Sequence, residues 1–238
     1  MAKEMKTPER LLRVPFCPGC GHGIFVRLMQ EVIEEKGLSE RYISAVGVGC
    51  SSNSIGATYG GNIVEAHHGR APSVTRAMKA LRPNCFVWTY QGDGDAYAIG
   101  MLETIHAANA DAPISVFVIN NNNYGMTGGQ SAPTTLKGQV TTTSPYGHEG
   151  NPIDIIPQLM TYEHVGYIAR GTVTSAAEIR KLKGYIRKAV DMQMNENKYS
   201  FVEILSPCPT NWHKSPIDAC NWINEVVTQK FPLGEFRG

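Results

Sequence analysis

The sequence has no long apolar run and no excess of charge of either sign. No stretch approaches membrane-spanning length, and residues 1–16 scatter charged side chains where a signal peptide requires an apolar core. Lys and Arg total 22 against 21 Asp and Glu, a formal net charge of +1, so no overall field attracts a polyanion. We therefore expect a cytoplasmic protein that binds neither nucleic acid nor membranes.

The sequence also lacks internal repeats, low-complexity tracts and linker-like stretches. Its 238 residues, 42% of them hydrophobic and 18% charged, suffice for one well-buried domain of ordinary size. A domain of this size needs no disulfide framework, so metal binding or redox chemistry better explains its six cysteines. We predict a single domain over residues 1–238.

Helical and strand-like patterns alternate along the chain. Apolar residues recur at helical spacing in four segments: 22–36, 74–81, 96–109 and 153–162. Strand-like runs occupy five more: 42–48, 86–91, 114–120, 165–169 and 199–205. Further helices are predicted after Ser175, which forms a capping box with Glu178, and after Ser215. The alternation predicts an α/β fold with a mostly parallel sheet and helices on both faces.

Unusual residues follow the ends of several predicted strands. They are Gly49-Cys50, Gly92-Asp93-Gly94-Asp95, residues 120–123 and Cys208. The carboxyl ends of parallel strands lie at one edge of the sheet, and ligands of open α/β sheets bind in the crevice outside that edge. We therefore expect these segments to converge on one binding site.

The pair formed by Gly92-Asp93-Gly94 and Asn120-Asn121 indicates a cation site. A carboxylate at one strand end and an amide oxygen at the next can meet around a hard cation, which in turn can hold a diphosphate. The two glycines allow close backbone approach to phosphate oxygens, and the helix predicted after Asp95 directs its N-terminus toward them. The glycine–aspartate motif alone is equally typical of a strand–helix turn, but the pair at this spacing is more specific.

Four cysteines remain available as metal ligands. A zinc ribbon would require a second CxxC motif, and a thioredoxin-like dithiol would follow a βαβ unit, which is absent before the CxxC at Cys17. Four thiolates suffice for an iron–sulfur cluster. The proposed ligands are Cys17, Cys20, Cys50 and Cys208, whereas Cys85 and Cys220 are predicted to be buried, structural residues.

Several segments together strongly resemble one protein family. They are Cys17-Pro-Gly-Cys-Gly-His, Gly47-Val-Gly-Cys-Ser-Ser, His68-Gly-Arg-Ala, Gly92-Asp-Gly-Asp, Tyr124-Gly-Met-Thr-Gly-Gly-Gln and Cys208-Pro-Thr. From about Cys17 to the end, the chain resembles the β subunit of 2-oxoacid:ferredoxin oxidoreductases. Residues 141–146 and 208–212 most resemble the multi-subunit 2-oxoisovalerate type. Arg76 departs from the family pattern, which has a small residue there, and this bears on how its helix packs.

The resemblance implies a thiamine-diphosphate-binding fold and an enzyme of anaerobic metabolism. The implied reaction is coenzyme A-dependent oxidative decarboxylation of a 2-oxoacid, with electrons passed through a 4Fe-4S cluster to ferredoxin. The implied magnesium ligands are Asp93, Asn121 and the backbone of Asn123. The implied cofactor contacts are Gly21, His22, Gly92, Asp93, Gly94, Asp95, Asn121, Asn123, Tyr124, Gly125, Met126 and Thr127.

The resemblance also implies partner subunits. Thiamine enzymes need a pyrimidine-binding domain that presents a glutamate to the cofactor, and the 238 residues leave no room for one. We expect an α subunit that carries this domain, together with γ and ferredoxin-like δ subunits. The isolated chain should be inactive.

The catalytic candidates are His22, His68, Asn53 and Met126. Neither histidine has a carboxylate partner that the sequence reveals. Asn53 occupies the position at which relatives that favour 2-oxoglutarate carry Lys or Arg, so an uncharged substrate such as 2-oxoisovalerate is expected, with Met126 as an apolar wall. Residues 124–152 form either a lid over the cofactor or a surface loop.

Two alternatives remain at this stage. The first is a redox-independent thiamine enzyme, a decarboxylase or synthase, in which the cysteines are structural. The second is a non-catalytic, zinc-stabilised binding protein in which the glycine–aspartate and asparagine segments are turns.

Overall fold

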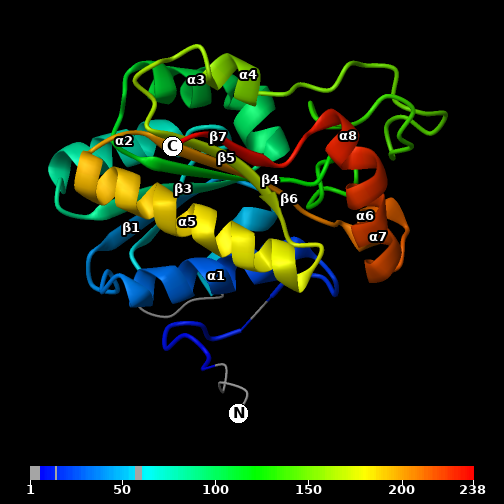
Figure 1. The fold of residues 1–238 in the computed structure, drawn as a ribbon. Helices are drawn as coiled ribbons and strands as arrows, with labels where there is room; N and C mark the ends of the chain where they lie inside the picture. The colour runs from blue at the N-terminus through cyan, green and yellow to red at the C-terminus, as the bar shows by residue number, and fades with distance from the viewer. Residues whose placement is uncertain (1–5, 14, 57–60) are drawn as a thin grey trace.

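A computed structural model describes residues 6–13, 15–56 and 61–238, and its centre is a seven-stranded sheet (Figure 1). The strand order is β2-β1-β3-β4-β6-β5-β7, and every neighbouring pair is parallel except β5 and β7. The strands are β1 (Tyr42–Val46), β2 (Ile63–Glu65), β3 (Phe86–Gly92), β4 (Ser115–Asn120), β5 (Tyr167–Thr172), β6 (Ser200–Leu205) and β7 (Gly234–Arg237).

Helices cover both faces of the sheet. Figure 1 shows α1 and α5 side by side on one face and α3 and α4 on the other. The helices are α1 (Gly21–Glu35), α2 (Ala71–Leu81), α3 (Met101–Asn109), α4 (Ile156–Leu159), α5 (Ala176–Glu196), α6 (Pro209–Trp212), α7 (Pro216–Trp222) and α8 (Thr228–Lys230). A 3-10 segment η1 (Cys50–Gly56) and two π-helical turns, η2 (Asp95–Ile99) and η3 (Ile223–Val227), complete the set. The predicted α/β class is confirmed.

The core consists of two apolar layers, one on each face of the sheet. Phe25 and Met29 of α1 pack with Trp88 and Phe117 on one face, and Ala107 of α3 belongs to the cluster on the other. Strands β3 to β6 have nearly every residue buried, as expected for parallel strands covered on both sides. The burial of their apolar side chains therefore supplies the main stabilisation of the fold.

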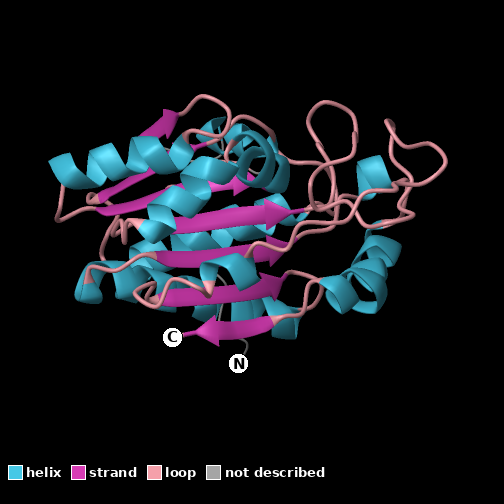
Figure 2. Ribbon diagram, turned by 90° about the horizontal axis from the view of Figure 1, so that it is seen from above, coloured by secondary structure: helices cyan, strands magenta, loops and turns pink. Residues whose placement is uncertain are grey.

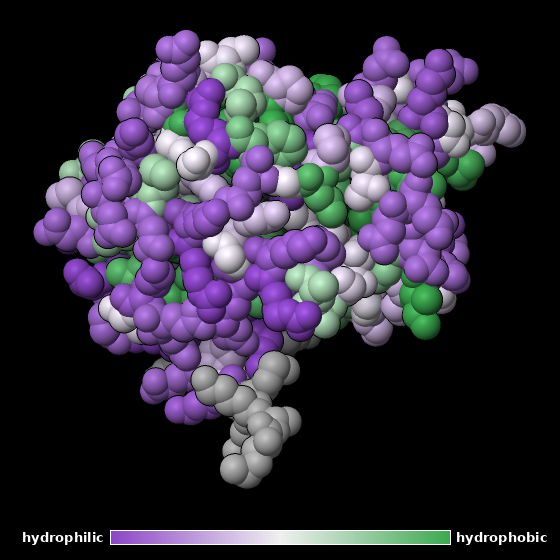
Figure 3. All heavy atoms as spheres, viewed as in Figure 1, coloured by the Kyte–Doolittle hydropathy of each residue, from purple (hydrophilic) through white to green (hydrophobic). Residues whose placement is uncertain are grey.

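The outer faces of α1 and α5 are polar. Lys183 of α5 forms ion pairs with Glu31 and Glu35 of α1, and Arg187 pairs with the same Glu35. Figure 3 shows that this side of the molecule is largely hydrophilic, with scattered apolar patches. In the part of the chain that the structure describes, no helix has both the length and the apolar character needed to cross a membrane.

Most predicted elements are present, with two differences among the helices. The segment 153–162 contains only the short helix α4, because Pro157 lacks a backbone N–H and restricts the residue before it, so a helix can begin but not pass through there. The segment 96–109 is divided into η2 and α3 at Gly100, where a Cβ atom would lie 2.8 Å from the Cα of Gly69. The predicted N-cap is confirmed, since Ser175 Oγ accepts from the Glu178 N–H at 3.2 Å, while the Glu178 carboxylate pairs with Lys181.

The carboxyl ends of the parallel strands face one edge of the molecule. Figure 2 shows their arrowheads pointing to the side where the long loops gather, whereas β7 points the other way. The loop of residues 121–155 leaves β4 at that edge, and α6 follows β6 there. Arg76 does not disturb α2, because its guanidinium lies toward α3 and meets His106 Nδ1 at 2.8 Å.

Candidate functional site

A cavity of about 180 Å³ lies at the carboxyl edge of the sheet. It draws its walls from α1, from the segments after β1, β2 and β3, and from the loop after β4. The residues that line it are His22, Val48, Gly49, Cys50, His68, Gly92, Asp93, Gly94, Asp95, Asn121, Asn123, Tyr124, Gly125, Met126 and Thr127. The structure therefore brings together the segments that the sequence expected to converge.

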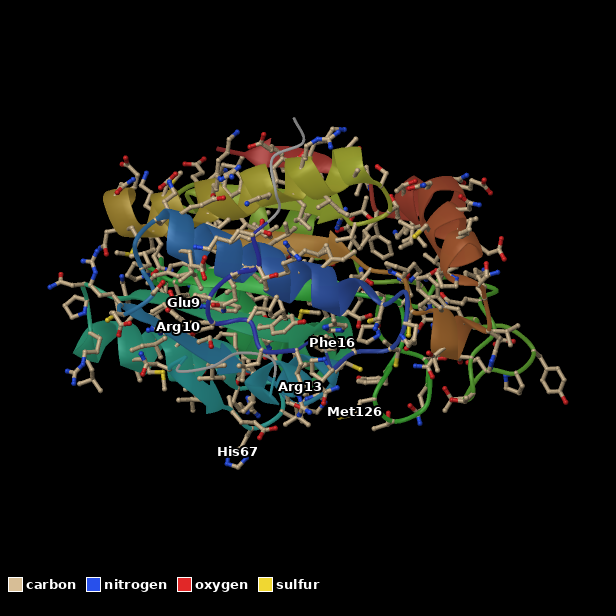
Figure 4. All side chains as sticks on the ribbon, turned by 90° about the horizontal axis from the view of Figure 1, so that it is seen from below. Glu9, Arg10, Arg13, Phe16, His67 and Met126 are labelled. Atoms are coloured by element: carbon tan, nitrogen blue, oxygen red, sulfur yellow. The ribbon has the colours of Figure 1, made fainter. Side chains whose placement is uncertain are left out.

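Every predicted cofactor-contact residue except Gly21 lines this cavity. Gly21 begins α1 instead, and a Cβ atom there would lie 2.8 Å from a methyl group of Val173. Asn53 is exposed on η1 and also lies outside the lining. Met126 is 47% exposed and lies at the periphery of this edge, whereas the exposed side chain of His67 points away from the protein (Figure 4).

Three oxygen atoms can converge beside Gly92 and Gly94. The inward amide position of Asn121 is 3.3 Å from Asp93 Oδ1 and 2.7 Å from the carbonyl oxygen of Asn123. With nitrogen inward, the amide donates to both of these oxygens; with oxygen inward, it adds a third oxygen to them. Carboxylate, amide and carbonyl oxygens are the ligands of hard cations, so this donor set fits magnesium.

Asp93 is a buried carboxyl group whose charge is only partly compensated. Thr134 Oγ1 donates a hydrogen bond to its Oδ2, while its Oδ1 faces the other two oxygens. Burial raises the pKa of Asp93 to about 7, against the lowering effect of the Thr134 hydrogen bond. A divalent cation in contact with Oδ1 would favour the ionised form and offset the cost of burying the charge.

Asp95 has a different role, because its hydrogen bonds hold His68. Its Oδ1 contacts His68 Nδ1 and also accepts the Gly69 N–H at 2.8 Å, and Gln91 Nε2 donates to its Oδ2 at 2.5 Å. The carboxylate partner that the sequence did not reveal is therefore Asp95. Because Nδ1 is engaged, Nε2 is the ring nitrogen of His68 that can bond to a ligand in the cavity.

His22 is an uncharged histidine at the start of α1. Burial lowers its pKa to about 4, so the ring is neutral at pH 7. Its Nδ1 lies 2.5 Å from the hydroxyl of Tyr90, whose pKa burial raises well above 10. Tyr90 therefore keeps its proton, and its hydroxyl shares one hydrogen bond with Nδ1, which leaves Nε2 as the other ring nitrogen of His22. Phe16 stacks on the ring at 5.3 Å.

The four cysteines proposed as cluster ligands lie near one another. Burial, together with negative charge on Cys208, Cys50 and Cys17, raises the pKa of Cys20 to about 12. Burial also raises the pKa of Cys50 to about 11, with added effects of Cys208 and Cys17. Thiols that are this hard to ionise become thiolates when positive metal charge compensates them, so the donor set fits an iron–sulfur cluster.

Cys50 connects the set of four proposed cluster cysteines to the cavity. It lines the cavity, and its Sγ is 3.3 Å from the position of a Cβ atom at Gly125. Cys85 and Cys220 do not line it; they are partly rather than fully buried. Among the described residues, no three His, Cys, Asp or Glu side chains are grouped so that they could hold a single metal ion.

Several residues that support the site were not predicted as site residues. Trp212 Nε1 donates to the Asn121 carbonyl at 3.1 Å, and Asn211 Nδ2 donates to the Gly125 carbonyl at 2.9 Å and to Cys208 Sγ at 3.4 Å. Asn211 and Trp212 belong to the Cys-Pro-Thr-Asn-Trp segment that carries part of the resemblance, which was their signal in the sequence. Thr134 lies in a long loop and has no comparable signal.

Oxygen atoms of Asp93, Asn121 and Asn123 lie at the carboxyl edge of a mostly parallel sheet. This arrangement is typical of domains that bind a diphosphate-containing cofactor. In agreement, residues 46–204 match the family described as thiamine pyrophosphate enzyme, C-terminal TPP binding domain. The sequence is 40% identical over 226 residues to the ketoisovalerate oxidoreductase subunit VorA of Methanothermobacter marburgensis, covering 93% of this chain and 47% of that one. It is 36% identical to the 2-oxoglutarate synthase subunit KorB of Methanocaldococcus jannaschii, covering 88% and 77%.

The chain belongs to the 2-oxoacid:ferredoxin oxidoreductase family, with a thiamine pyrophosphate-binding domain. It spans about half the length of the VorA subunits that it matches. A solved structure, the 2-oxoglutarate:ferredoxin oxidoreductase of Magnetococcus marinus with 2-oxoglutarate, coenzyme A and succinyl-CoA bound, matches it with a TM-score of 0.81 at 27% identity. That match covers 94% of this chain and 74% of the other. The predicted family is confirmed.

Proposed function

We propose that this chain is the thiamine-diphosphate-binding β subunit of a coenzyme A-dependent 2-oxoacid:ferredoxin oxidoreductase. The observation that carries the proposal is the shared cavity, which Asp93, with its neighbouring oxygens, and the thiol of Cys50 line together. An oxygen site suited to a diphosphate-bound cation and a thiol site suited to an electron acceptor thus lie at one edge of the sheet. Neither a redox-independent thiamine enzyme nor a zinc-stabilised scaffold needs this arrangement.

The cofactor would be held through its charged end. Asp93 Oδ1, the Asn121 amide oxygen and the Asn123 carbonyl would bind magnesium, and Gly92 and Gly94 would leave room for the diphosphate. The segment Tyr124 to Thr127 would cover its other side. When bound, thiamine diphosphate would supply the chemistry that decarboxylates a 2-oxoacid, and Cys17, Cys20, Cys50 and Cys208 would hold a 4Fe-4S cluster suited to accept electrons.

The chain's own polar groups would orient the ligands. His22, neutral and held through Nδ1, offers Nε2 as a polar contact that does not add charge to the cavity. His68, held by Asp95, presents Nε2 as a second polar contact in the cavity. The tight hydrogen bonds on Nδ1 in both rings fix which nitrogen faces the ligand.

The proposal includes partner subunits. Thiamine enzymes activate the cofactor with a glutamate, and among the described residues that line the cavity there is no glutamate. An α subunit would supply it, with γ and ferredoxin-like δ subunits completing the complex and ferredoxin receiving the electrons. The exposed apolar side chains of Val48, Ile55 and Met126 near this edge support coverage by another chain.

The proposed substrate is a 2-oxoacid with an uncharged side chain, such as 2-oxoisovalerate. The described lining of the cavity contains no Lys or Arg, and a second substrate carboxylate would be costly without a cation. The related subunits include both ketoisovalerate and 2-oxoglutarate types, so a kinetic comparison must decide. A higher kcat/KM for 2-oxoglutarate than for 2-oxoisovalerate in the assembled complex would contradict this assignment.

Anaerobic co-purification with the partner subunits tests the proposed function. Iron, sulfide and thiamine diphosphate should be present, and the complex should reduce a viologen dye with 2-oxoacid and coenzyme A. Serine at Cys17, Cys20, Cys50 or Cys208 should lower the iron content, whereas Cys85→Ser and Cys220→Ser should preserve it. Zinc in place of iron in the wild-type complex would refute the cluster assignment.

A further inference from the structure

Asn211 links Cys208, one of the four proposed cluster cysteines, to the loop that lines the cavity. Its Nδ2 carries two hydrogens, and the structure gives them two acceptors: the carbonyl oxygen of Gly125 at 2.9 Å and Cys208 Sγ at 3.4 Å. The first acceptor lies on the cavity wall, and the second is a proposed cluster ligand. Nothing in the assignment of ligands explains why an amide should bridge them.

The bridge is held in a fixed position. Asn211 lies in α6, directly after Cys208, and the adjacent Trp212 anchors the same helix to the Asn121 carbonyl. Gly129, whose φ is +82°, lies against Asn211: a Cβ atom at Gly129 would be 3.1 Å from the Asn211 Cβ. The loop therefore uses a glycine where a side chain would displace this amide.

The hydrogen bond acts on a sulfur atom that is otherwise poorly solvated. Cys208 is 8% exposed, and Asn211 Nδ2 donates to its Sγ at 3.4 Å. An N–H donor directed at a buried sulfur therefore stabilises negative charge there. In a cluster, reduction by one electron increases the negative charge carried by the iron, sulfide and thiolate atoms.

We propose that Asn211 tunes the reduction potential of the cluster that Cys208 helps to hold. The N–H donor stabilises the more negative, reduced cluster more than the oxidised one, and so raises the potential. Anchoring the same amide on Gly125 ties this effect to the wall of the cofactor cavity. Asn211 is a positioning residue in this role: it acts on the electron acceptor through a ligand and need not touch the substrate. The inference rests on the proposed function, because it requires a cluster at this site.

The test is a redox titration of the assembled, anaerobically purified complex, followed by EPR of the reduced cluster. Asn211→Leu keeps a similar size but removes both donors, so the midpoint potential should fall below that of the wild type. Asn211→Asp keeps the shape and places a carboxyl group beside the thiolate, so the potential should fall further. Iron and sulfide content and the EPR line shape establish that each variant retains the cluster.

Trp212→Phe is the matched control. It removes a hydrogen bond of similar length between the same helix and the same loop, but its donor points to a carbonyl oxygen rather than to sulfur. Its potential should equal that of the wild type. If Trp212→Phe and Asn211→Leu shift the potential equally, the effect is loosening of α6, and the proposal is overturned.

A measurement on the wild-type complex covers the case in which both Asn211 variants lose the cluster. Pulsed EPR after exchange into D2O, with ¹⁵N-labelled asparagine, should detect an exchangeable deuteron and a nitrogen coupled to the reduced cluster. Absence of both couplings would refute the hydrogen bond. A wild-type complex without iron would instead refute the proposed function, whereas an intact cluster with an unchanged potential in Asn211→Leu would refute only the role of Asn211.

Discussion

Two buried carboxyl groups, Glu203 in strand β6 and Asp93 directly after strand β3, are in opposite electrostatic situations. Glu203 on β6 accepts hydrogen bonds from Tyr97 and Asn120 on one oxygen and from Arg170 on the other. Arg170 is itself fully buried and also donates to Asp154 at 2.5 Å. The charge of Glu203 is thus compensated within the chain, as a buried ion pair requires.

Asp93 has no cation from its own chain among its described contacts. Its hydrogen-bond donors include Thr134 and the Gly94 backbone, and burial leaves its pKa near 7. The comparison teaches that burial alone does not mark a functional carboxylate, because Glu203 is buried just as deeply. What distinguishes Asp93 is that its described contacts include no cation, which is the situation that our proposed metal site requires.

The largest effect should come from removing the carboxylate that awaits a cation. Asp93→Ala should abolish retention of thiamine diphosphate while leaving the fold intact, since the diphosphate loses the charged ligand of its proposed metal. Bound cofactor per complex and the circular dichroism spectrum measure the two outcomes. Normal cofactor occupancy in this variant would show that Asp93 is not needed for the site.

Removing the cation that compensates Glu203 should lower the stability of the fold. Arg170→Met leaves Glu203 buried without its cation and should lower the free energy of unfolding by about 3–5 kcal/mol. Denaturant titration of the purified chain measures this change. The control Lys181→Met breaks an exposed pair with Glu178 and should leave stability nearly unchanged. Equal effects of the two substitutions would contradict the electrostatic explanation.

The sequence predicted the site around Asp93 better than the buried ion pair of Glu203 with Arg170. Asp93 and Asn121 follow consecutive strands, and a parallel sheet brings such positions to one edge, so their spacing was informative. Glu203 lies inside the predicted strand 199–205, whereas Arg170 lies just beyond the predicted strand 165–169 and inside the observed β5. Their pairing depends on the β5–β6 register, Arg170 opposite Glu203, which the sequence alone does not fix.

The histidines show the same limit. The pairing of His68 with Asp95 was not predicted, because it depends on the close approach of Gly69 to Gly100 and on the π-helical turn η2. The short strand β2 and the antiparallel strand β7 were also missed, since neither has a long apolar run. These features depend on contacts between segments that are distant in the sequence. The strands of the central sheet, in contrast, could be predicted from their own apolar residues.

His22 extends the comparison to a buried base that remains neutral. Its folded pKa of about 4 lies below the ordinary value of 6.5, so the unfolded chain binds more protons between these values. The contribution of His22 to stability is complete above pH 6.5 and is lost as the pH falls toward 4. It amounts to roughly 3 kcal/mol by the usual conversion of pKa shifts.

The variant His22→Phe should therefore flatten the pH dependence of stability between pH 6.5 and 4. Unfolding midpoints in urea, measured at several pH values, provide the comparison with the wild type. A matched control is His67→Phe, because His67 is exposed and its removal should leave the profile unchanged. A wild-type profile that is retained in His22→Phe would assign the dependence to other groups.

The smallest expected effect concerns how Asp93 is oriented. Thr134 is buried and donates to Asp93 Oδ2, which leaves Oδ1 facing Asn121 and Asn123, much as Tyr97 and Asn120 fix one oxygen of Glu203. Thr134→Val keeps the shape of the side chain but removes the hydroxyl. The carboxylate then loses its fixed orientation, and residues in such supporting positions typically change metal affinity by about 10–100-fold.

We therefore expect Thr134→Val to weaken magnesium-dependent binding of thiamine diphosphate to the assembled complex by about 10–100-fold. Titration of the metal-free complex with magnesium at saturating cofactor measures this affinity directly. Thr75→Val is the control, since Thr75 is equally buried but donates to carbonyl oxygens within α2 and does not line the cavity. If both variants lose affinity equally, general loosening of the fold explains the loss. If only Thr134→Val loses magnesium affinity, the loop that follows β4 helps to shape the cation site. The chain then orients the buried Asp93 carboxylate even though the described residues do not compensate its charge.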